Sequence, residues 1–596
     1  MQTDCIIDSL QTKYKMLQEK YGLDVLNERK DVNLLIKKSI CKFLKQCSIP
    51  AIWCYGRHTK MMMSDFMFEF KDVYYIIDNG IKNKEESGFE IINQNSIEEK
   101  NIDGIIISSR IHRDEIIKTI RSKYSHIQYL DIYSELEQAG IKIDVSYYSI
   151  GHPYIRYSLI NKRQRFFLKA KDKVSCVLEL KKIIGMYIDI KDFQSAIKYA
   201  RKMLKLSHSI EAEDLLDQLK DIYELQLEIL KKIHENNVLV LCIDGLRRKE
   251  ISIEYLNNLL IFLNKHTYYF TNAYSVSTST FESLIPAYSE NDNLKTKYYQ
   301  MNKIKSNNCR FIMTAKKQNR KIVFYTDGAE YIEDDKIRVK SQSQTATEKL
   351  WDFIIDAIEE KNGLFYIHIL YESHYSYPNP YTAEEIVADG TNIMFDYLEH
   401  NGGQIRTDYN KQQKDALKYI DDVIVPLIEK LQCRMVLFAD HGNILIDKGM
   451  PLESIEKTKF TFHEDLIQVP LAIKSPEMEV KKDTGINSIM ELNNIIISLM
   501  EKKRVELKKK DYIKVVRSEI YNPDFKYLYK KVDNEQGLLA FEVFIFRDGY
   551  KLAVYADGTV ELYLAETDTE VHDALIRKRL WEKIKNKITV CDEQKI

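Results

Sequence analysis

Four short apolar segments after residue 235 each end in polar side chains. Their sequences are VLVLCIDG, KIVFYTDG, FYIHILYESH and RMVLFADHGN, and stretches with helical spacing separate them. Continuous apolar runs of this length are typical of parallel strands that are buried on both faces. In an open α/β sheet, ligands bind at the carboxyl ends of the strands. The pattern therefore predicts an α/β domain whose polar strand ends converge on one site.

A second set of alternating strands and helices lies near the amino terminus. The segments SIPAIWCYG, DVYYIID, IDGIIISS and HIQYLDIY predict a Rossmann-like α/β domain within residues 1–160. One interpretation is a nucleotide pocket around Gly56 and Asp78, and the other is a scaffold. We favour the scaffold, because the first turn has one glycine where the dinucleotide fingerprint has three. A bound dinucleotide is not expected, whereas a nucleotide sugar stays open.

The segment between these two α/β regions has the spacing of amphipathic helices. Phe193, Ala196, Ile197 and Ala200 lie on one helical face, and the surrounding sequence is similar to one tetratricopeptide hairpin. We therefore expect a helical linker over residues 161–235. The catalytic core is expected over residues 236–505, and a β-rich subdomain with a final helix over residues 506–596, where two Asp-Gly turns separate alternating strands.

Composition excludes several classes of protein. The 596 residues carry 88 Lys and Arg against 89 Asp and Glu, which argues against a nucleic-acid binder held by its overall charge. The nine cysteines are scattered without a C-x-x-C pair, as expected of reduced thiols. The sequence predicts neither a secretory signal nor an apolar run of about 18 residues that would span a membrane. We expect a cytoplasmic location, compatible with peripheral membrane contact.

Candidate chemistry lies in an ordered set of residues at or near the predicted strand ends. The set is Asp244, a Ser/Thr cluster at 275–286, His374, the pair Asp440 and His441, and His463. An Asp-His pair directly after an apolar strand is suited to binding a divalent cation. Each member alone has a structural alternative, such as a turn cap, a helix cap or a hydrogen-bonded interior imidazole. The complete set at strand ends favours a catalytic site.

This set resembles the alkaline phosphatase and sulfatase superfamily, and within it the phosphoethanolamine transferases and lipoteichoic acid synthases, over residues 236–575. Asp244 matches the acidic residue that closes the family's first strand. The segment STSTFESLIP places the family's nucleophilic threonine at Thr280, with Ser283 three residues later. Pro286 falls one position later than in the family pattern, so Thr278 and Ser279 stay as alternative nucleophiles.

The remaining residues match the family's other motifs. Asp440 and His441 match its Asp-His-Gly motif, while His374 and His463 match two further histidines. The resemblance implies that Asp244, Thr280, Asp440 and His441 hold a divalent metal, with zinc expected first and manganese second. It also implies that Thr280 is the nucleophile and that His374 and His463 bind the phosphoryl substrate.

The resemblance implies a metal-dependent phosphotransferase. It would move a substituted phosphoryl group, of the phosphoethanolamine or phosphoglycerol type, from a phosphate-ester donor to a glycan or glycan precursor through a covalent threonine intermediate. The alternatives are a phosphodiesterase or phosphatase that uses the same site, and a non-catalytic module that senses a nucleotide sugar. No Cys-x-Pro-x-Arg or Ser-x-Pro-x-Arg segment lies near Thr280, which argues against the formylglycine route of arylsulfatases.

Overall fold

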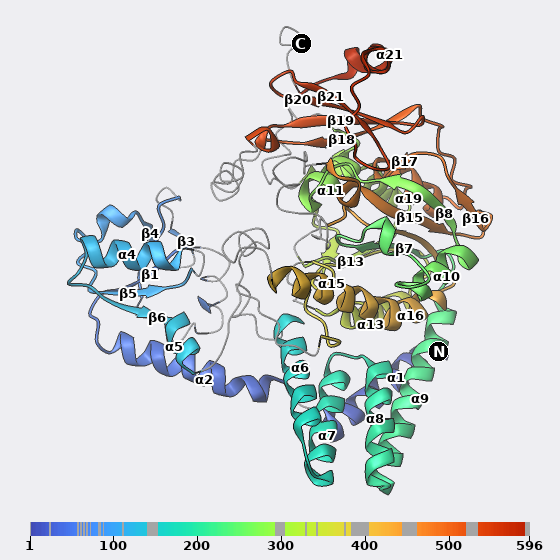
Figure 1. Cartoon of the computed structure of the whole chain (residues 1–596). Helices are drawn as coiled ribbons and strands as arrows, with labels where there is room; N and C mark the ends of the chain where they lie inside the picture. The colour runs from blue at the N-terminus through green and yellow to red at the C-terminus, as the bar shows by residue number, and fades with distance from the viewer. Residues whose placement is uncertain are drawn as a thin grey trace.

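The structure is a computed structural model of the chain. It describes residues 2–22, 25–55, 59, 62–63, 66, 69–71, 73–80, 85–86, 89–109, 112–139, 153–292, 304–327, 331–340, 344–374, 377–382, 404–443, 462–519 and 535–590. Within these ranges the α/β class predicted from the sequence is confirmed, with parallel sheets covered by helices (Figure 1).

The amino-terminal α/β unit is built on a six-stranded sheet of order β3-β4-β2-β1-β5-β6 in the described residues. All neighbouring strands run parallel except β3, which is antiparallel to β4. The order is consistent with the predicted Rossmann-like domain. Its elements are α2 (Val25–Leu44), β1 (Pro50–Trp53), β2 (Tyr75–Ile77), β3 (Glu85–Glu86), β4 (Phe89–Ile92), β5 (Gly104–Ile107), α4 (Arg113–Lys123), β6 (Gln128–Asp131) and α5 (Ile132–Gln138).

The sequence offered Gly56 and Asp78 as residues of a nucleotide pocket, and the structure describes only the second of them. Gly56 lies outside the described residues. The carboxylate of Asp78 accepts hydrogen bonds from the backbone amides of Tyr55, at 2.8 Å, and Gly80, at 2.9 Å. Asp78 therefore fixes the turn that follows β2, which is the behaviour that the scaffold interpretation expects.

A layer of helices connects to the central domain through a continuous hydrophobic core. Its members are α1 (Gln2–Tyr21), α6 (Pro153–Lys169), α7 (Lys173–Asp189), α8 (Phe193–Ser207) and α9 (Ile210–Lys232). Asp172, Asp192 and Ser209 cap the amino termini of α7, α8 and α9 through their side chains. Buried residues of this layer, such as Ile183 and Ile229, belong to the same core as the central sheet.

The central domain contains a sheet with the strand order β12-β10-β13-β7-β14-β15-β8-β16, and β17 also pairs with β8. Only β15 runs against its neighbours among the described strands. The strands are β7 (Val238–Ile243), β8 (Tyr268–Tyr274), β10 (Lys321–Tyr325), β12 (Ile337–Val339), β13 (Gly363–Ile369), β14 (Arg434–Phe438), β15 (Gln468–Lys474), β16 (Lys481–Asp483) and β17 (Asn487–Ser488). A separate pair is formed by β9 (Ile304–Lys305) and β11 (Ile332–Glu333).

Helices cover both faces of this sheet (Figure 1). One face carries α10 (Asn257–His266), α13 (Ala346–Ile358), α15 (Gln404–Val423) and α16 (Val425–Glu429). The other face carries α11 (Thr280–Ser289), α12 (Arg310–Lys317) and α19 (Leu492–Met500). A short helix, α18 (Glu464–Ile467), precedes β15. Short 3-10 helices are found at Gln94–Ser96, Arg248–Glu250, Ser306–Asn308, Ile489–Glu491, Glu535–Leu538 and Lys585–Lys587.

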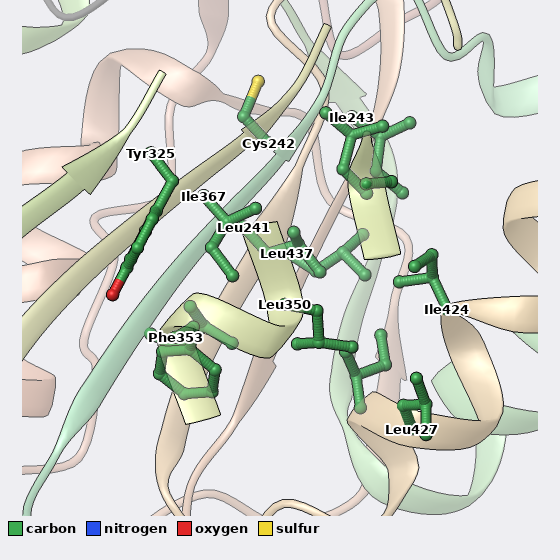
Figure 2. Packing of buried hydrophobic residues seen from close by; sticks show 14 of the residues in the cluster. Leu241, Cys242, Ile243, Tyr325, Leu350, Phe353, Ile367, Ile424, Leu427 and Leu437 are labelled. Atoms are coloured by element: carbon green, nitrogen blue, oxygen red, sulfur yellow. The ribbon is translucent and has the colours of Figure 1, made fainter. Parts of the chain in front are cut away.

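The core explains why the central strands are apolar throughout. Leu241 is in register with Ile367 on one side and Leu437 on the other, so the three side chains form a row across the sheet. This row packs toward Leu350 of α13 and Leu427 of α16 (Figure 2). Burying each such side chain stabilises the fold by about 1.5–3 kcal/mol. Because both faces are covered, a polar residue in these strands needs a specific partner.

The predicted β-rich subdomain is present at the carboxyl terminus. Strands β18 (Tyr512–Arg517), β19 (Phe541–Phe546), β20 (Tyr550–Tyr555) and β21 (Val560–Leu564) form an antiparallel sheet in sequential order. The last helix, α21 (Ala574–Ile584), packs Leu580 and Ile584 against one face of this sheet. None of the helices in the described ranges has the length and apolar character that crossing a membrane requires.

Candidate active site

Two neighbouring parallel strands place three candidate metal ligands together. Asp244 directly follows β7, and Asp440 and His441 follow β14 after one alanine. The two strands are in register, with Cys242 opposite Phe438, so their carboxyl ends lie side by side. One ligand atom from each of the three residues lies within 4.8 Å of the others. The structure therefore brings together three of the residues that the strand-end pattern singled out.

Two glycines allow the turns after these strands to interlock. Gly245 has a φ of 63°, a conformation that side chains disfavour, and its amide donates to Asp440 Oδ1 at 3.2 Å. Asn443 Nδ2 donates in turn to the Gly245 carbonyl at 3.1 Å. Gly442 packs so closely on α18 that a Cβ atom there would lie 1.9 Å from the carbonyl oxygen of Asp465. The backbone of both turns is thus fixed around Asp440.

Thr280 is the first residue of α11 and faces this cluster. Its Oγ1 donates to Asp244 Oδ2 at 3.1 Å and lies 3.1 Å from His441 Nε2. Of the two alternative nucleophiles, Ser279 is exposed and is the extended residue before the helix, and Thr278 is partly exposed. Among the three hydroxyls, the one of Thr280 is therefore placed against the candidate metal ligands.

Ser283 anchors the start of α11 to the same strand end. Its Oγ donates to the carbonyl of Asp440 at 2.6 Å. The same oxygen accepts hydrogen bonds from the amides of Val276, at 3.2 Å, and Ser277, at 3.3 Å. The serine three residues after Thr280 thus holds the preceding loop and the helix against β14. This arrangement limits the positions that the Thr280 hydroxyl can take.

The cluster carries negative charge that is removed from water. The side chains of Asp244 and Asp440 are completely buried. Within the described part of the chain, Asp244 Oδ1 and Asp440 Oδ2 are buried without a hydrogen-bond partner. Leaving such oxygens unpaired is costly, and a cation between them removes the cost. Two carboxylates, an imidazole and a hydroxyl also suit zinc or manganese, so the residues present fit a divalent metal.

The pKa values of the cluster follow the same electrostatics. Burial, reinforced by the charge of Asp244, raises the pKa of Asp440. Burial also acts to raise the pKa of Asp244, but the hydrogen bond with His368 and the charges of nearby histidines hold this pKa below its usual range. Burial acts to lower the pKa of His441, and the charges of Asp440 and Asp244 more than offset it, so the pKa is raised. The site thus favours positive charge between the two aspartates.

His368 is a member of the site that the sequence analysis did not single out. It lies within β13, is completely buried, and its Nε2 is 3.2 Å from Asp244 Oδ2. The sequence signal is a single imidazole inside an otherwise apolar strand, GLFYIHI. Register places it opposite Cys242, two residues before Asp244. His368 is therefore suited to orient the carboxylate of Asp244.

We expect replacement of His368 by leucine to weaken zinc binding by about 10- to 100-fold, as is typical when the partner of a metal ligand is removed. His368→Gln keeps a polar group near Asp244 and is expected to lose less. Titration of metal-free protein with zinc in a calorimeter measures the affinity. His266→Gln, at a partly exposed histidine that pairs with Glu429, serves as the control. Unchanged affinity in His368→Leu would show that Asp244 is oriented without His368.

The two histidines expected to bind substrate have different surroundings. His374 lies exposed on the turn after β13, and its charge contributes to lowering the pKa of Asp244. His463 caps α18 by accepting from the Asp465 amide at 3.1 Å through Nδ1. Its Nε2 lies 3.5 Å from the carboxylate of Asp568 in the carboxyl-terminal subdomain. Among the contacts described for His463, none is to the metal-ligand cluster.

Several solved structures are similar to this chain at low sequence identity. The lipoteichoic acid synthase LtaP from Listeria monocytogenes is 13% identical with a TM-score of 0.40, over 60% of this chain and 91% of its own. Phosphonate monoester hydrolase SpPMH from Silicibacter pomeroyi is 12% identical with a TM-score of 0.43, over 59% and 96%. The C-terminal periplasmic domain of EcEptC from Escherichia coli is 14% identical with a TM-score of 0.35, over 49% and 91%.

A comparison with curated protein sequences finds no match. The comparison with family models finds one, described as Sulfatase, over residues 236–502. This range begins just before β7 and includes every candidate metal ligand, the candidate nucleophile and both histidines expected to bind substrate. Residues 236–502 therefore match the Sulfatase family model, and the whole candidate active site lies within the matched residues.

Proposed function

We propose that this protein is a metal-dependent phosphotransferase that works through a covalent intermediate on Thr280. The donor would be a phosphate ester that carries a phosphoethanolamine or phosphoglycerol group. The acceptor would be a hydroxyl of a glycan or glycan precursor. Zinc is the expected metal, with manganese second. The sulfatase family supplies the class of chemistry, phosphate or sulfate ester cleavage, and the rest of this proposal concerns the residues and the groups transferred.

The observation that carries the proposal is the position of the Thr280 hydroxyl. Oγ1 lies 3.1 Å from both Asp244 Oδ2 and His441 Nε2, beside two buried carboxylates. A threonine hydroxyl is a weak nucleophile at neutral pH and must be activated by its surroundings. Asp244, Asp440 and His441 would hold the cation, with Thr280 as fourth ligand, and the bound cation supplies the Lewis acidity that lowers the pKa of this hydroxyl.

Transfer would proceed in two displacements at phosphorus. In the first, Thr280 Oγ1 forms a bond to phosphorus, and the bond from phosphorus to the donor oxygen breaks. The proton released from the threonine balances the one that the departing alcohol takes up, and Asp244 Oδ2 is the first atom positioned to accept it. In the second displacement, the oxygen of the acceptor hydroxyl forms a bond to phosphorus, the bond from phosphorus to Thr280 Oγ1 breaks, and the proton lost by the acceptor restores the Thr280 hydroxyl.

His374 and His463 would act on the substrate in both displacements. His374 is exposed beside the site and is suited to bind a phosphoryl oxygen, where negative charge develops. His463 would contact the leaving or entering oxygen, and its hydrogen bond with Asp465 and proximity to Asp568 would orient the ring. Neither role requires a further metal ion.

Mass spectrometry of the metal-loaded protein tests the covalent step. The protein is incubated separately with phosphatidylethanolamine, phosphatidylglycerol and CDP-ethanolamine in the absence of an acceptor. Tryptic cleavage then isolates residues 266–295, which contain Thr278, Ser279 and Thr280. We expect one donor to leave an adduct on Thr280, and the added mass identifies the group transferred. Thr278→Ala is expected to retain the adduct.

The other results have separate meanings. Turnover of a chromogenic phosphodiester without an adduct would mean that water resolves the intermediate, which replaces transfer with phosphodiester hydrolysis. An adduct on Thr278 or Ser279 would reassign the nucleophile. Neither adduct nor turnover, in protein that contains stoichiometric metal, would overturn the proposed phosphoryl chemistry.

A further inference from the structure

The helical layer ends in two hairpin turns that lie at the same end of the molecule. Helices α6 and α7 form one antiparallel hairpin and α8 and α9 form the next, with α7 packed against α8. Consecutive helices therefore run in opposite directions, which places the turn at 170–172 and the turn at 208–209 at the same end of the helical layer. Figure 1 shows both turns at the lower end of the view, below the central domain.

The first turn presents large apolar side chains to solvent. Leu168 is 70% exposed, Val174 is 79% exposed and Leu178 is 52% exposed. Phe166, two residues earlier in α6, is 42% exposed, and Ile210 at the second turn is 86% exposed. Single exposed apolar residues are common on soluble proteins, but a cluster at one end of a helical hairpin marks an interaction surface. We define residues 166–178 as the hairpin tip.

The hairpin tip is also strongly basic. Lys169, Lys171 and Lys173 are exposed and stand between Leu168 and Val174 in the sequence. None of the ion pairs formed within the described residues involves these three lysines. The one acidic residue of the turn, Asp172, is engaged in capping α7, where it accepts from the amide and the hydroxyl of Ser175. The tip therefore presents net positive charge around its apolar side chains.

We propose that the hairpin tip docks on an anionic lipid surface. Projecting Leu168 and Val174 would enter the boundary between headgroups and acyl chains, and the lysines would contact lipid phosphates. Apolar residues alternating with lysines at the end of a helical element have the composition of an interfacial membrane anchor. An acidic protein partner would match the charge but would not need aliphatic side chains that project from the end of the helices rather than along a groove.

The hairpin tip lies at the far end of α6 from the candidate active site. Tyr157, near the start of α6, donates to Glu372 at 2.7 Å, two residues before His374. The helix rise places Lys169 about 18 Å from Tyr157 along α6. The tip is thus separated from the site along the length of α6, and the proposal does not rest on the transferase assignment. Tip variants should hydrolyse a soluble chromogenic phosphodiester like the parent protein.

Vesicle sedimentation of the full chain tests the proposal. We expect the protein to sediment with vesicles of phosphatidylcholine and phosphatidylglycerol, to stay in solution with phosphatidylcholine alone, and to release at high salt. The variant Lys169→Glu/Lys171→Glu/Lys173→Glu should bind about a hundredfold more weakly, since each lysine near an anionic surface contributes roughly fivefold. Leu168→Ser/Val174→Ser should weaken binding with its charge unchanged.

Matched controls use other exposed positions. Lys508→Glu/Lys509→Glu changes charge in a second basic segment, and Ile253→Ser removes an isoleucine that is also exposed. Both should bind like the parent protein. The proposal is overturned if the intact chain does not sediment with anionic vesicles, or if the tip variants sediment as well as the controls. It is also overturned if Leu168→Ser/Val174→Ser abolishes self-association in solution while vesicle binding is kept.

Discussion

Replacing Thr280 with alanine is expected to reduce turnover of a chromogenic phosphodiester by at least about a thousandfold, because the change removes the attacking oxygen. In the folded protein this oxygen contacts Asp244 and His441, each at 3.1 Å. Thr280→Ser restores a hydroxyl on the same Cβ. It is expected to keep a measurable fraction of the activity, reduced because the side chain lacks the methyl group that restricts its rotamers.

The contrast with neighbouring hydroxyls makes this test specific. Thr278→Ala and Ser279→Ala remove hydroxyls from the same loop and should stay within about tenfold of the parent rate, since neither hydroxyl is placed against Asp244. Metal content is measured in parallel, because Thr280 is also a candidate ligand. If Thr280→Ala keeps its turnover while one of the other two variants loses it, the nucleophile assignment is wrong.

Part of the site could be predicted from the sequence, because ligands of an open α/β sheet bind at the carboxyl ends of its strands. Asp244, Asp440 and His441 follow apolar runs, and the parallel register of β7 and β14 brings their ends to one level. His368 could not be found in that way, because it lies inside a strand and its contact with Asp244 depends on the order of strands in the sheet. Strand order is a long-range property that local periodicity does not contain.

The helical segment illustrates the same limit. The spacing of Phe193, Ala196 and Ala200 predicts a helix with one apolar face, but not the surface which that face covers. In the structure, this layer shares its core with the central sheet, and Tyr157 reaches across 215 positions to Glu372. Through Tyr157 of α6, which begins before the predicted linker boundary at residue 161, the helical layer thus supports the segment that carries His374. Only the packing of distant segments reveals this role.

Replacing Gly442 with alanine is expected to destabilise the central domain by about 3 kcal/mol or more and to weaken zinc binding. A Cβ at this position would lie 1.9 Å from the carbonyl oxygen of Asp465, which is backbone and cannot rotate away. Either α18 or the turn after β14 must shift, and that turn carries Asp440 and His441. The expected results are a lower thermal unfolding midpoint and a reduced zinc affinity.

Gly485→Ala is the matched control. It lies in the same domain, and its new Cβ would meet the side chains of Asp483, at 3.0 Å, and Asn487, at 3.9 Å. Those side chains can move, so stability should change by less than about 1 kcal/mol and zinc affinity should stay unchanged. If Gly442→Ala unfolds and binds zinc like the parent protein, the close approach between the Asp-His-Gly turn and α18 is not what fixes the ligands. If it loses stability but binds zinc with full affinity once folded, the contact supports the fold and the ligand geometry depends on Ser283 and the Gly245 turn instead.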